Sequence, residues 1–205
     1  MKSINQYIQE KLFVKGKTKY KYFPKNRTEL RKLVRDRILH EGNNVNLNDI
    51  DTSEITNMES LFYSSWAEDF CGDISQWDVS NVTTMNHMFY GCKLFNCDLS
   101  NWKTSKLENM RSMFGECHSF EGKGLDNWDV SKVTTIEGTF GYCYSLKGKE
   151  LENWNVQNVV HSIDTFYGCK ELSCNLDNWK LNNPKEWDDM FEGCTKMQIP
   201  KWYYK

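Results

Sequence analysis

Residues 99–124, LSNWKTSKLENMRSMFGECHSFEGKG, are one copy of a unit that recurs along this chain of 205 residues. Within the unit, apolar residues return mostly at every third position. This spacing matches neither the two-residue period of a strand nor the 3.6-residue period of a long helix. It is typical of a chain that turns a corner, runs briefly extended and turns again.

Three residue types keep the same step along the chain. Tryptophan recurs at steps of 25, 26, 26 and 25 residues, and a phenylalanine and a cysteine follow each of these tryptophans at fixed distances. The recurring residues are Trp77, Trp102, Trp128, Trp154, Trp179, Phe89, Phe114, Phe140, Phe166, Phe191, Cys92, Cys117, Cys143, Cys169 and Cys194. A fixed period in the twenties indicates a solenoid in which each coil buries its apolar edge against its neighbours.

The segment Leu-x-x-Trp-x-Val/Thr in each unit matches the part of a leucine-rich repeat that forms a short strand. The predicted fold class is an α/β solenoid, a leucine-rich-repeat-like right-handed coil of about six repeats of 25–26 residues. We expect short parallel strands and an α-helical N-terminal cap. The predicted divisions are a basic N-terminal cap at 1–45, the solenoid at 46–197 and an aromatic C-terminal cap at 198–205.

The first 45 residues differ in charge from the rest. They hold 12 Lys and Arg against 4 Asp and Glu, a net charge of +8, whereas residues 46–205 hold 14 against 24, a net charge of -10. The pattern predicts a short helix within 4–12, a short strand around Tyr20 and Tyr22, and a helix that begins at an N-cap Thr28 and ends near Gly42. The predicted buried stripe of that helix is Leu30, Leu33, Val34 and Ile38.

Composition and the N-terminus bear on location. Apolar residues make up 39% and aromatic residues 14%, enough for the core of one domain. No apolar run approaches the ~20 residues that a membrane-spanning helix needs. Residues 1–7 show no apolar signal segment. We therefore expect the protein to lie in the cytoplasm of the producing or infected cell, or at the cell surface if a signal segment was removed.

The stretch WDVSNVTTM at 77–85, followed by MFYGC at 88–92, resembles the repeat of the BspA-like leucine-rich repeat family. The resemblance covers about residues 46–197. That family is described mostly as bacterial surface proteins and lipoproteins, and its repeat also occurs in phages and large viruses. The resemblance implies adhesion or protein binding and transfers no functional residue.

The eight cysteines allow three interpretations. Five share one repeat position, so we expect a buried column of thiols that pack as small apolar side chains. Disulfides within the column and a zinc site are the alternatives. No C-x-x-C pair occurs in the sequence.

Alternation around each tryptophan predicts one polar face. If the tryptophans point inward, the residues on either side point outward and form a row that a protein partner could contact. The residues of this row are Gln76, Asp78, Ser80, Asn101, Lys103, Ser105, Asn127, Asp129, Ser131, Asn153, Asn155, Gln157, Asn178 and Lys180. The Asn before each Trp has a second interpretation, as a ladder or turn residue that satisfies backbone groups.

The basic N-terminal region offers an alternative surface for phosphates of a nucleic acid or nucleoprotein. Its candidate residues are Lys17, Lys19, Lys21, Arg31, Lys32 and Arg35. The structural alternative is a cap whose charge is balanced by the acidic repeats. We expect the outer side chains of the helix, Arg31, Lys32, Arg35 and Arg37, to be solvated.

No catalytic set stands out, because the four histidines occupy unrelated repeat positions and no nucleophile, metalloprotease or phosphate-loop motif occurs. We predict no enzyme activity, no cofactor and no metal. The predicted function is a protein-binding module that presents a repeat surface to a protein partner, for example a phage or bacterial factor that acts on a host protein. Nucleic-acid binding through the basic cap and a surface adhesin are the alternatives.

Overall fold

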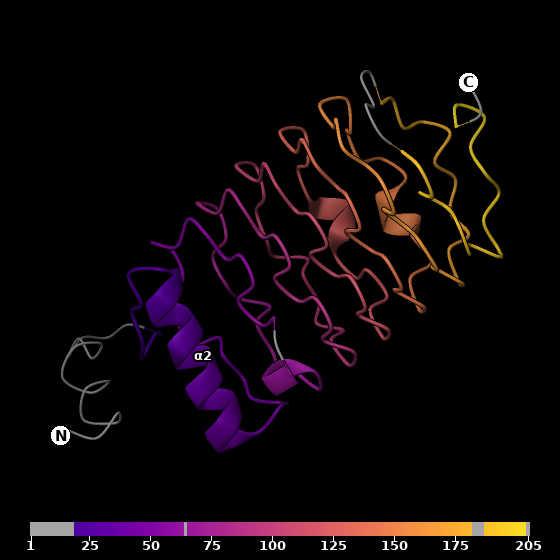
Figure 1. Ribbon diagram of the computed structural model, residues 1–205. Coiled ribbons are helices and arrows are strands. Elements are labelled where there is room, and N and C mark those ends of the chain that lie inside the picture. The colour runs from indigo at the N-terminus through magenta and orange to yellow at the C-terminus, as the bar shows by residue number, and fades with distance from the viewer. Residues whose placement is uncertain (1–18, 64, 182–186, 204–205) are drawn as a thin grey trace.

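The computed structural model describes residues 19–63, 65–181 and 187–203. In these residues the helices are the α-helix α2 (Arg27–Glu41) and three short 3₁₀ helices, η1 (Ser65–Ala67), η2 (Leu125–Asn127) and η3 (Lys149–Leu151). Figure 1 shows successive loops of chain stacked side by side along one axis, with α2 against one end. We call this arrangement the repeat stack. The predicted helix within 4–12 lies outside the described residues.

The three-residue apolar period comes from tight turns. Within one repeat, the amide of Trp77 donates to the carbonyl of Ile74, that of Met88 to Met85, and that of Cys92 to Phe89. Each of these bonds closes a turn from residue i to residue i+3, so the apolar residues at both ends of a turn point to the same side. A series of such turns places every third side chain in the core.

Backbone hydrogen bonds join each repeat to the next. The amide of Met85 donates to the carbonyl of Asn109, that of His87 to Arg111, and that of Phe89 to Met113, each over 2.9 Å. Parallel pairing is limited to isolated bridges. One column of bridges runs through Asn57, Thr84, Asn109, Thr135 and His161.

The prediction of an α/β solenoid of leucine-rich-repeat type with short parallel strands is wrong. The described residues contain no strand and no sheet, and most of them lie in turns and irregular chain. The pairing stops after one bridge because a residue with positive φ follows three positions later, as at His87 (φ 52°) and Ser112 (φ 49°). A left-handed residue cannot continue an extended strand.

The predicted strand position is wrong as well. The bridge column lies seven residues after each tryptophan, and no bridge joins the tryptophan segments themselves in the described repeats. Side chains join these segments instead. The indole of Trp77 donates to the carbonyl of Leu47 over 3.0 Å, and Thr52 Oγ1 donates to the carbonyl of Asp78 over 2.9 Å.

Aromatic columns form the core of the repeat stack. The ring centroids of Phe114 and Phe140 lie 5.7 Å apart with planes 6° apart, and Trp128 and Trp154 lie 6.4 Å apart with planes 9° apart. Every tryptophan of the column is buried. Stacked aromatic rings bury large areas and set the spacing of the repeats.

The cysteines form the predicted column of buried thiols. Each thiol donates to the carbonyl of the phenylalanine one repeat earlier, for example Cys143 to Phe114 over 3.0 Å and Cys169 to Phe140 over 2.9 Å. All eight cysteines of the chain lie in the described residues and are free thiols. Burial raises the pKa of the column thiols, so they are neutral packing groups.

Helix α2 covers the first repeat with the predicted stripe, because Leu30, Leu33, Val34 and Ile38 are buried. Its C-cap is the predicted Gly42, whose amide donates to the carbonyl of Ile38 over 2.9 Å. The N-cap is Asn26 rather than Thr28, because the Asn26 side chain accepts a 3.0 Å hydrogen bond from the amide of Glu29. An asparagine oxygen in this position satisfies a free amide of the first turn.

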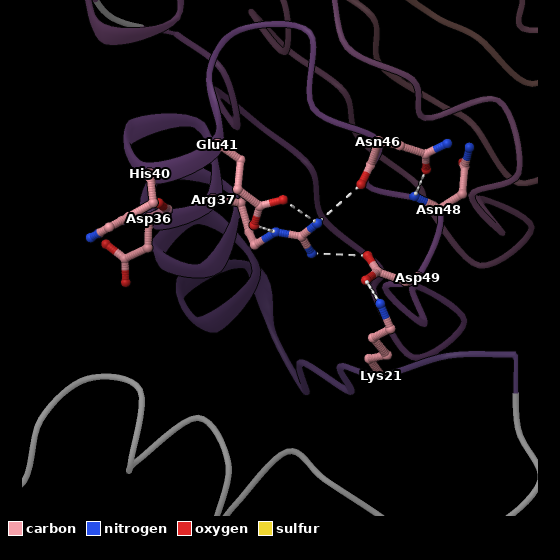
Figure 2. A network of polar contacts seen from close by, with 8 residues as sticks. All are labelled: Lys21, Asp36, Arg37, His40, Glu41, Asn46, Asn48 and Asp49. Atoms are coloured by element: carbon pink, nitrogen blue, oxygen red, sulfur yellow. Dashed lines mark hydrogen bonds and ion pairs between the residues drawn. The ribbon is translucent and has the colours of Figure 1, made fainter.

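The expectation that the basic outer side chains of α2 are solvated is wrong for Arg31 and Arg37. Arg31 donates to the carbonyls of Ser60 and Tyr63, each over 3.2 Å. Figure 2 shows Arg37 between Glu41 of its own helix and Asp49 of the first repeat, with its Nη1 2.9 Å from Asp49 Oδ1. The two arginines therefore attach α2 to the repeat stack.

At the other end of the chain, Trp202 continues the tryptophan pattern. Its indole donates to the carbonyl of Leu176 over 2.7 Å, as Trp179 donates to Leu151 over 2.9 Å. Tyr203 packs edge-on against Phe191, with centroids 5.2 Å apart. Trp202 and Tyr203 thus lie on the last phenylalanine of the core.

Candidate functional site

The predicted polar row is exposed along much of the repeat stack. All of its members are exposed except Asp78, Ser80 and Ser131, which are half-buried, and the tryptophans between them are buried. Several members also form the turns of their own repeat. Asp78 Oδ1 and Asp129 Oδ1 each accept a 3.0 Å hydrogen bond from the amide two residues later. Asn101 Nδ2 donates over 3.4 Å to the carbonyl of Ser75 in the preceding repeat, which agrees with its interpretation as a ladder residue that satisfies a backbone group.

The predicted basic surface is divided by its contacts within the chain. Lys17 lies outside the described residues. Lys21 pairs with Asp49 at 3.4 Å, and Lys19 lies over the ring of Tyr20 at 4.7 Å. Lys32 and Arg35 are exposed on α2, whereas Arg31 is bonded to the first repeat.

A surface that was not predicted from the sequence lies at the turns after the core phenylalanines. Four tyrosines, which we call the tyrosine edge, stand there in four of five consecutive repeats, namely Tyr63, Tyr90, Tyr142 and Tyr167. Tyr63 and Tyr142 are 47% and 41% exposed. Tyr63 and Tyr90 have centroids 5.6 Å apart, and Tyr142 and Tyr167 have centroids 5.3 Å apart. The tyrosine edge therefore consists of two ring pairs.

A depression of about 260 Å³ separates the two pairs. Tyr63, Tyr90 and Tyr167 directly follow the core phenylalanine of their repeats, whereas Gly115 and Gly141 occupy this position in the two central repeats. Small residues also line the depression one turn earlier, at Ser112 and Gly138. The hollow thus exists because two adjacent repeats lack the side chains that their neighbours carry.

Glycine also supports the rings at the rim. A Cβ atom on Gly115 would lie 2.8 Å from Tyr90 Cδ2, and one on Gly168 would lie 2.9 Å from Tyr142 Cδ1. These contacts are too close for a side chain, so each ring rests directly on the backbone of the next repeat. The rings are therefore held in place before any ligand binds.

Two carboxylates join the lining, Glu116 and Asp164. The Tyr90 hydroxyl donates to Glu116 Oε1 over 2.6 Å, and this hydrogen bond, with burial, raises the pKa of Tyr90 to about 12. Burial raises the pKa of Asp164, and the nearby Asp189 and Glu137 raise it further. The lining of the depression thus combines aromatic rings with acidic side chains.

A second depression lies on the other side of Tyr90, where Tyr63, Glu68 and Lys93 contribute to the lining. Lys93 Nζ and Glu68 Oε1 form an ion pair at 2.5 Å. Glu116 also lines this neighbouring hollow, which therefore holds two carboxylates and one ammonium group. The depression between Tyr90 and Tyr167 has no Lys or Arg among its described lining residues.

The position after the core phenylalanine carried the signal that could have revealed this site. Its sequence through the repeats is Tyr63, Tyr90, Gly115, Gly141, Tyr167 and Glu192. A run of tyrosines interrupted by two glycines predicts a gap once the repeats are stacked. None of the predicted site residues occupies this position, so the gap was missed.

Two further findings concern the described residues only. They include no group of three or more His, Cys, Asp or Glu side chains arranged to hold a metal ion. They also include no helix with the length and apolar character to span a membrane.

Comparison with known families matches residues 28–124 and 117–205 to DUF285, described as a Mycoplasma protein of unknown function. The chain belongs to the DUF285 family. The two matched stretches overlap at residues 117–124, and the tyrosine edge draws on both, with Tyr90 in the first and Tyr142 in the second. No curated protein and no solved structure matches the chain. The DUF285 description assigns no function, and the resemblance to BspA-like proteins stays a prediction.

Proposed function

We propose that this DUF285 protein is a non-enzymatic protein-binding module that contacts a protein partner through its tyrosine edge. The observation that carries the proposal is a pair of rings on each side of a hollow, in which one ring is exposed, the other is half-buried, and one rests on a glycine of the next repeat. Tyrosine is enriched at protein interfaces because one side chain offers a large apolar ring and a polar hydroxyl. The four rings are distributed over five consecutive repeats.

The packing of the rings favours binding. Tyr142 lies against Gly168 and Tyr167, and Tyr90 lies against Gly115 and is bonded to Glu116. Side chains that are ordered before association lose less conformational entropy on binding. A surface of this kind binds through preorganised area, with a few central residues supplying most of the free energy.

The predicted polar row is the other surface that a protein partner could use. Its side chains are exposed, but Asp78, Asp129 and Asn155 accept backbone hydrogen bonds in their own turns. Their polar groups are partly satisfied, so they gain less from a partner than unbonded groups would. The tyrosine edge is the better supported of the two surfaces.

The nucleic-acid alternative is less well supported. Binding to phosphates would use the cationic side chains of α2, and Arg31 and Arg37 are bonded to carbonyl and carboxylate groups of the first repeat. Substitution of either arginine would weaken the attachment of α2 to the repeat stack, so a loss of binding in such a variant would not identify a phosphate contact. We therefore propose no function for α2 beyond covering the first repeat.

The test begins with capture from a lysate of the native organism, and continues with direct binding of the purified captured protein. We compare the wild type with Tyr63→Ser/Tyr142→Ser on the tyrosine edge and Asn101→Arg/Asp129→Arg/Asn155→Arg on the polar row. We expect the purified partner to bind the wild type and the row variant, and to lose most of its affinity for the tyrosine variant.

Circular dichroism and thermal unfolding show whether both variants keep the wild-type fold. Loss of binding in the row variant alone would move the interface to the polar row. The absence of any protein that binds directly after purification would overturn the proposed function. Treatment of the lysate with nuclease separates a true protein contact from one bridged by nucleic acid.

A further inference from the structure

We propose that the depression between Tyr90 and Tyr167 receives one arginine side chain of the partner protein. The inference rests on the proposed protein-binding function and names the chemistry recognised at the centre of the tyrosine edge. It is carried by the shape of the hollow, its aromatic walls and its two carboxylates.

The size of the hollow fits a single side chain. Pockets for drug-sized molecules usually measure about 300–1,000 Å³, and this depression measures about 260 Å³. Four of its lining residues are small, namely Ser112, Gly115, Gly138 and Gly141. A lining of small residues lets a flexible chain approach the backbone without displacing a large side chain.

The walls suit a planar cation. The rings of Tyr90, Tyr142 and Tyr167 line the hollow, and a guanidinium group stacks on tyrosine faces through cation–π attraction. Tyr142 and Tyr167 meet edge to face at 65°, so they present differently oriented surfaces to a ligand. The ammonium of a lysine is more strongly hydrated and has no planar face to stack.

The charges of the lining favour a cation. Glu116 and Asp164 line the hollow, and Glu137 and Asp189 are near enough to Asp164 to act on its carboxyl group. Two described basic groups lie nearby. Arg111 pairs with Glu137 at 2.7 Å, and Lys93 pairs with Glu68 at 2.5 Å while also acting on Glu116, so the four carboxylates keep an excess of negative charge. A guanidinium has five N–H donors and can bond two carboxylates at once. A neutral sugar would gain the stacking but would leave this negative charge unbalanced.

The test uses small probes and needs no partner. The whole protein, labelled with ¹⁵N, is titrated with N-acetyl-arginine amide and followed by the amide signals of Gly115, Gly138 and Gly141. N-acetyl-citrulline amide is the matched neutral probe, because it keeps the shape and loses the charge. N-acetyl-lysine amide tests the ammonium group, and methyl glucoside tests a sugar.

We expect saturable shifts with the arginine probe, at a Kd of about 1 mM, and binding at least about tenfold weaker with the other three probes. Equal binding of the citrulline probe, or stronger binding of the lysine probe or of methyl glucoside, would overturn the assignment to arginine. Shifts with none of the probes would overturn it as well.

Gly141→Tyr tests the location. This substitution places a tyrosine at the repeat position that Tyr90 and Tyr167 occupy in their own repeats. The atom nearest to the new Cβ is Gly138 O, at 3.5 Å, so the backbone has room for the side chain. We expect the arginine probe to bind at least about tenfold more weakly to this variant. Glu192→Tyr, which places a tyrosine at the same repeat position outside the hollow, is the control and should keep the wild-type affinity.

A second variant covers the case in which Gly141→Tyr does not fold. Glu116→Gln/Asp164→Asn removes both charges and keeps the shape, and asparagine tolerates the positive φ of Asp164. We expect the same loss of arginine binding. Wild-type affinity in this variant would overturn the proposal. A purified partner that binds the tyrosine edge when the arginine probe does not would leave the proposed function standing and remove only this inference.

Discussion

The hydroxyl of Tyr90 lies 2.6 Å from Glu116 Oε1 and donates a hydrogen bond to it across the junction of two repeats. The two residues differ by 26 positions and meet because Gly115 leaves space for the tyrosine ring. This bond fixes one wall of the central depression, and its strength can be measured by titration.

Tyr90 should ionise later than ordinary tyrosines. The hydrogen bond to Glu116 and burial raise its pKa from 10.0 to about 12. The folded state holds this proton more tightly than the unfolded state, so the stabilisation is complete below pH ~10 and is lost as the pH rises through about 12. A tyrosinate absorbance titration should show one late step that Glu116→Ala moves to lower pH. Tyr90→Phe, which should remove that step, identifies the residue, and an unchanged late step in Glu116→Ala would contradict the account.

Two tryptophans in the same column should differ in their tolerance of Phe. Trp154 Nε1 donates to the carbonyl of Leu125 over 2.8 Å, whereas Trp128 Nε1 is buried without a partner in the described structure. Both side chains are buried, so the packing loss is matched. Trp154→Phe should lower the free energy of unfolding by about 1 kcal/mol more than Trp128→Phe, because only Trp154 loses a hydrogen bond. Urea unfolding of both variants measures the difference, and equal losses would be inconsistent with this arrangement.

The thiols should react in the order of their exposure. Cys71 is exposed, and the five cysteines of the column are buried. Burial also raises the pKa of Cys97 to about 11 and that of Cys174 to about 12, so neither has much thiolate near neutral pH. Brief treatment of the native protein with iodoacetamide should therefore modify Cys71 first, as peptide mapping by mass spectrometry would show. Cys71→Ser should abolish this early labelling, and rapid labelling of the column in the folded protein would refute the buried arrangement.

Two glycines with positive φ should differ in their response to alanine. A Cβ on Gly91 (φ 78°) would meet no heavy atom within 4 Å, whereas a Cβ on Gly124 (φ 90°) would lie 2.2 Å from the amide nitrogen of Ser100. Gly91→Ala should cost about 1–2 kcal/mol for the left-handed backbone alone. Gly124→Ala should cost more, because the backbone of the adjacent repeat must also move. Thermal unfolding of the two variants tests this order, which a more stable Gly124→Ala would reverse.

The sequence alone predicted the columns of the core but not the backbone that carries them. The steps between Trp102, Trp128 and Trp154 require stacked repeats whatever the local structure, so the buried rings and thiols could be expected. The absence of strands could not be predicted in the same way, because it depends on polar residues such as Ser112 and Asp164 that adopt positive φ. These residue types give little warning of a left-handed conformation, and a strand cannot pass through it.

The candidate site was hidden for a different reason. Sequence patterns emphasise residues that are present, whereas the depression depends on the side chains that Gly115 and Gly141 lack. The electrostatic setting is also a property of the stack, since Glu116 and Asp164 are 48 positions apart in the chain and line one hollow. The helix α2 shows the opposite case, because its buried stripe is local and was predicted correctly, with only the N-cap moved to Asn26.

The most direct test of the tyrosine edge is the affinity of a purified partner for the wild type, Gly141→Tyr and Glu192→Tyr, measured by titration calorimetry. The account predicts that filling the hollow in Gly141→Tyr weakens binding at least about tenfold, a loss of about 1.4 kcal/mol, while Glu192→Tyr binds like the wild type. Wild-type affinity in a folded Gly141→Tyr variant would contradict the claim that the partner enters the hollow between Tyr90 and Tyr167.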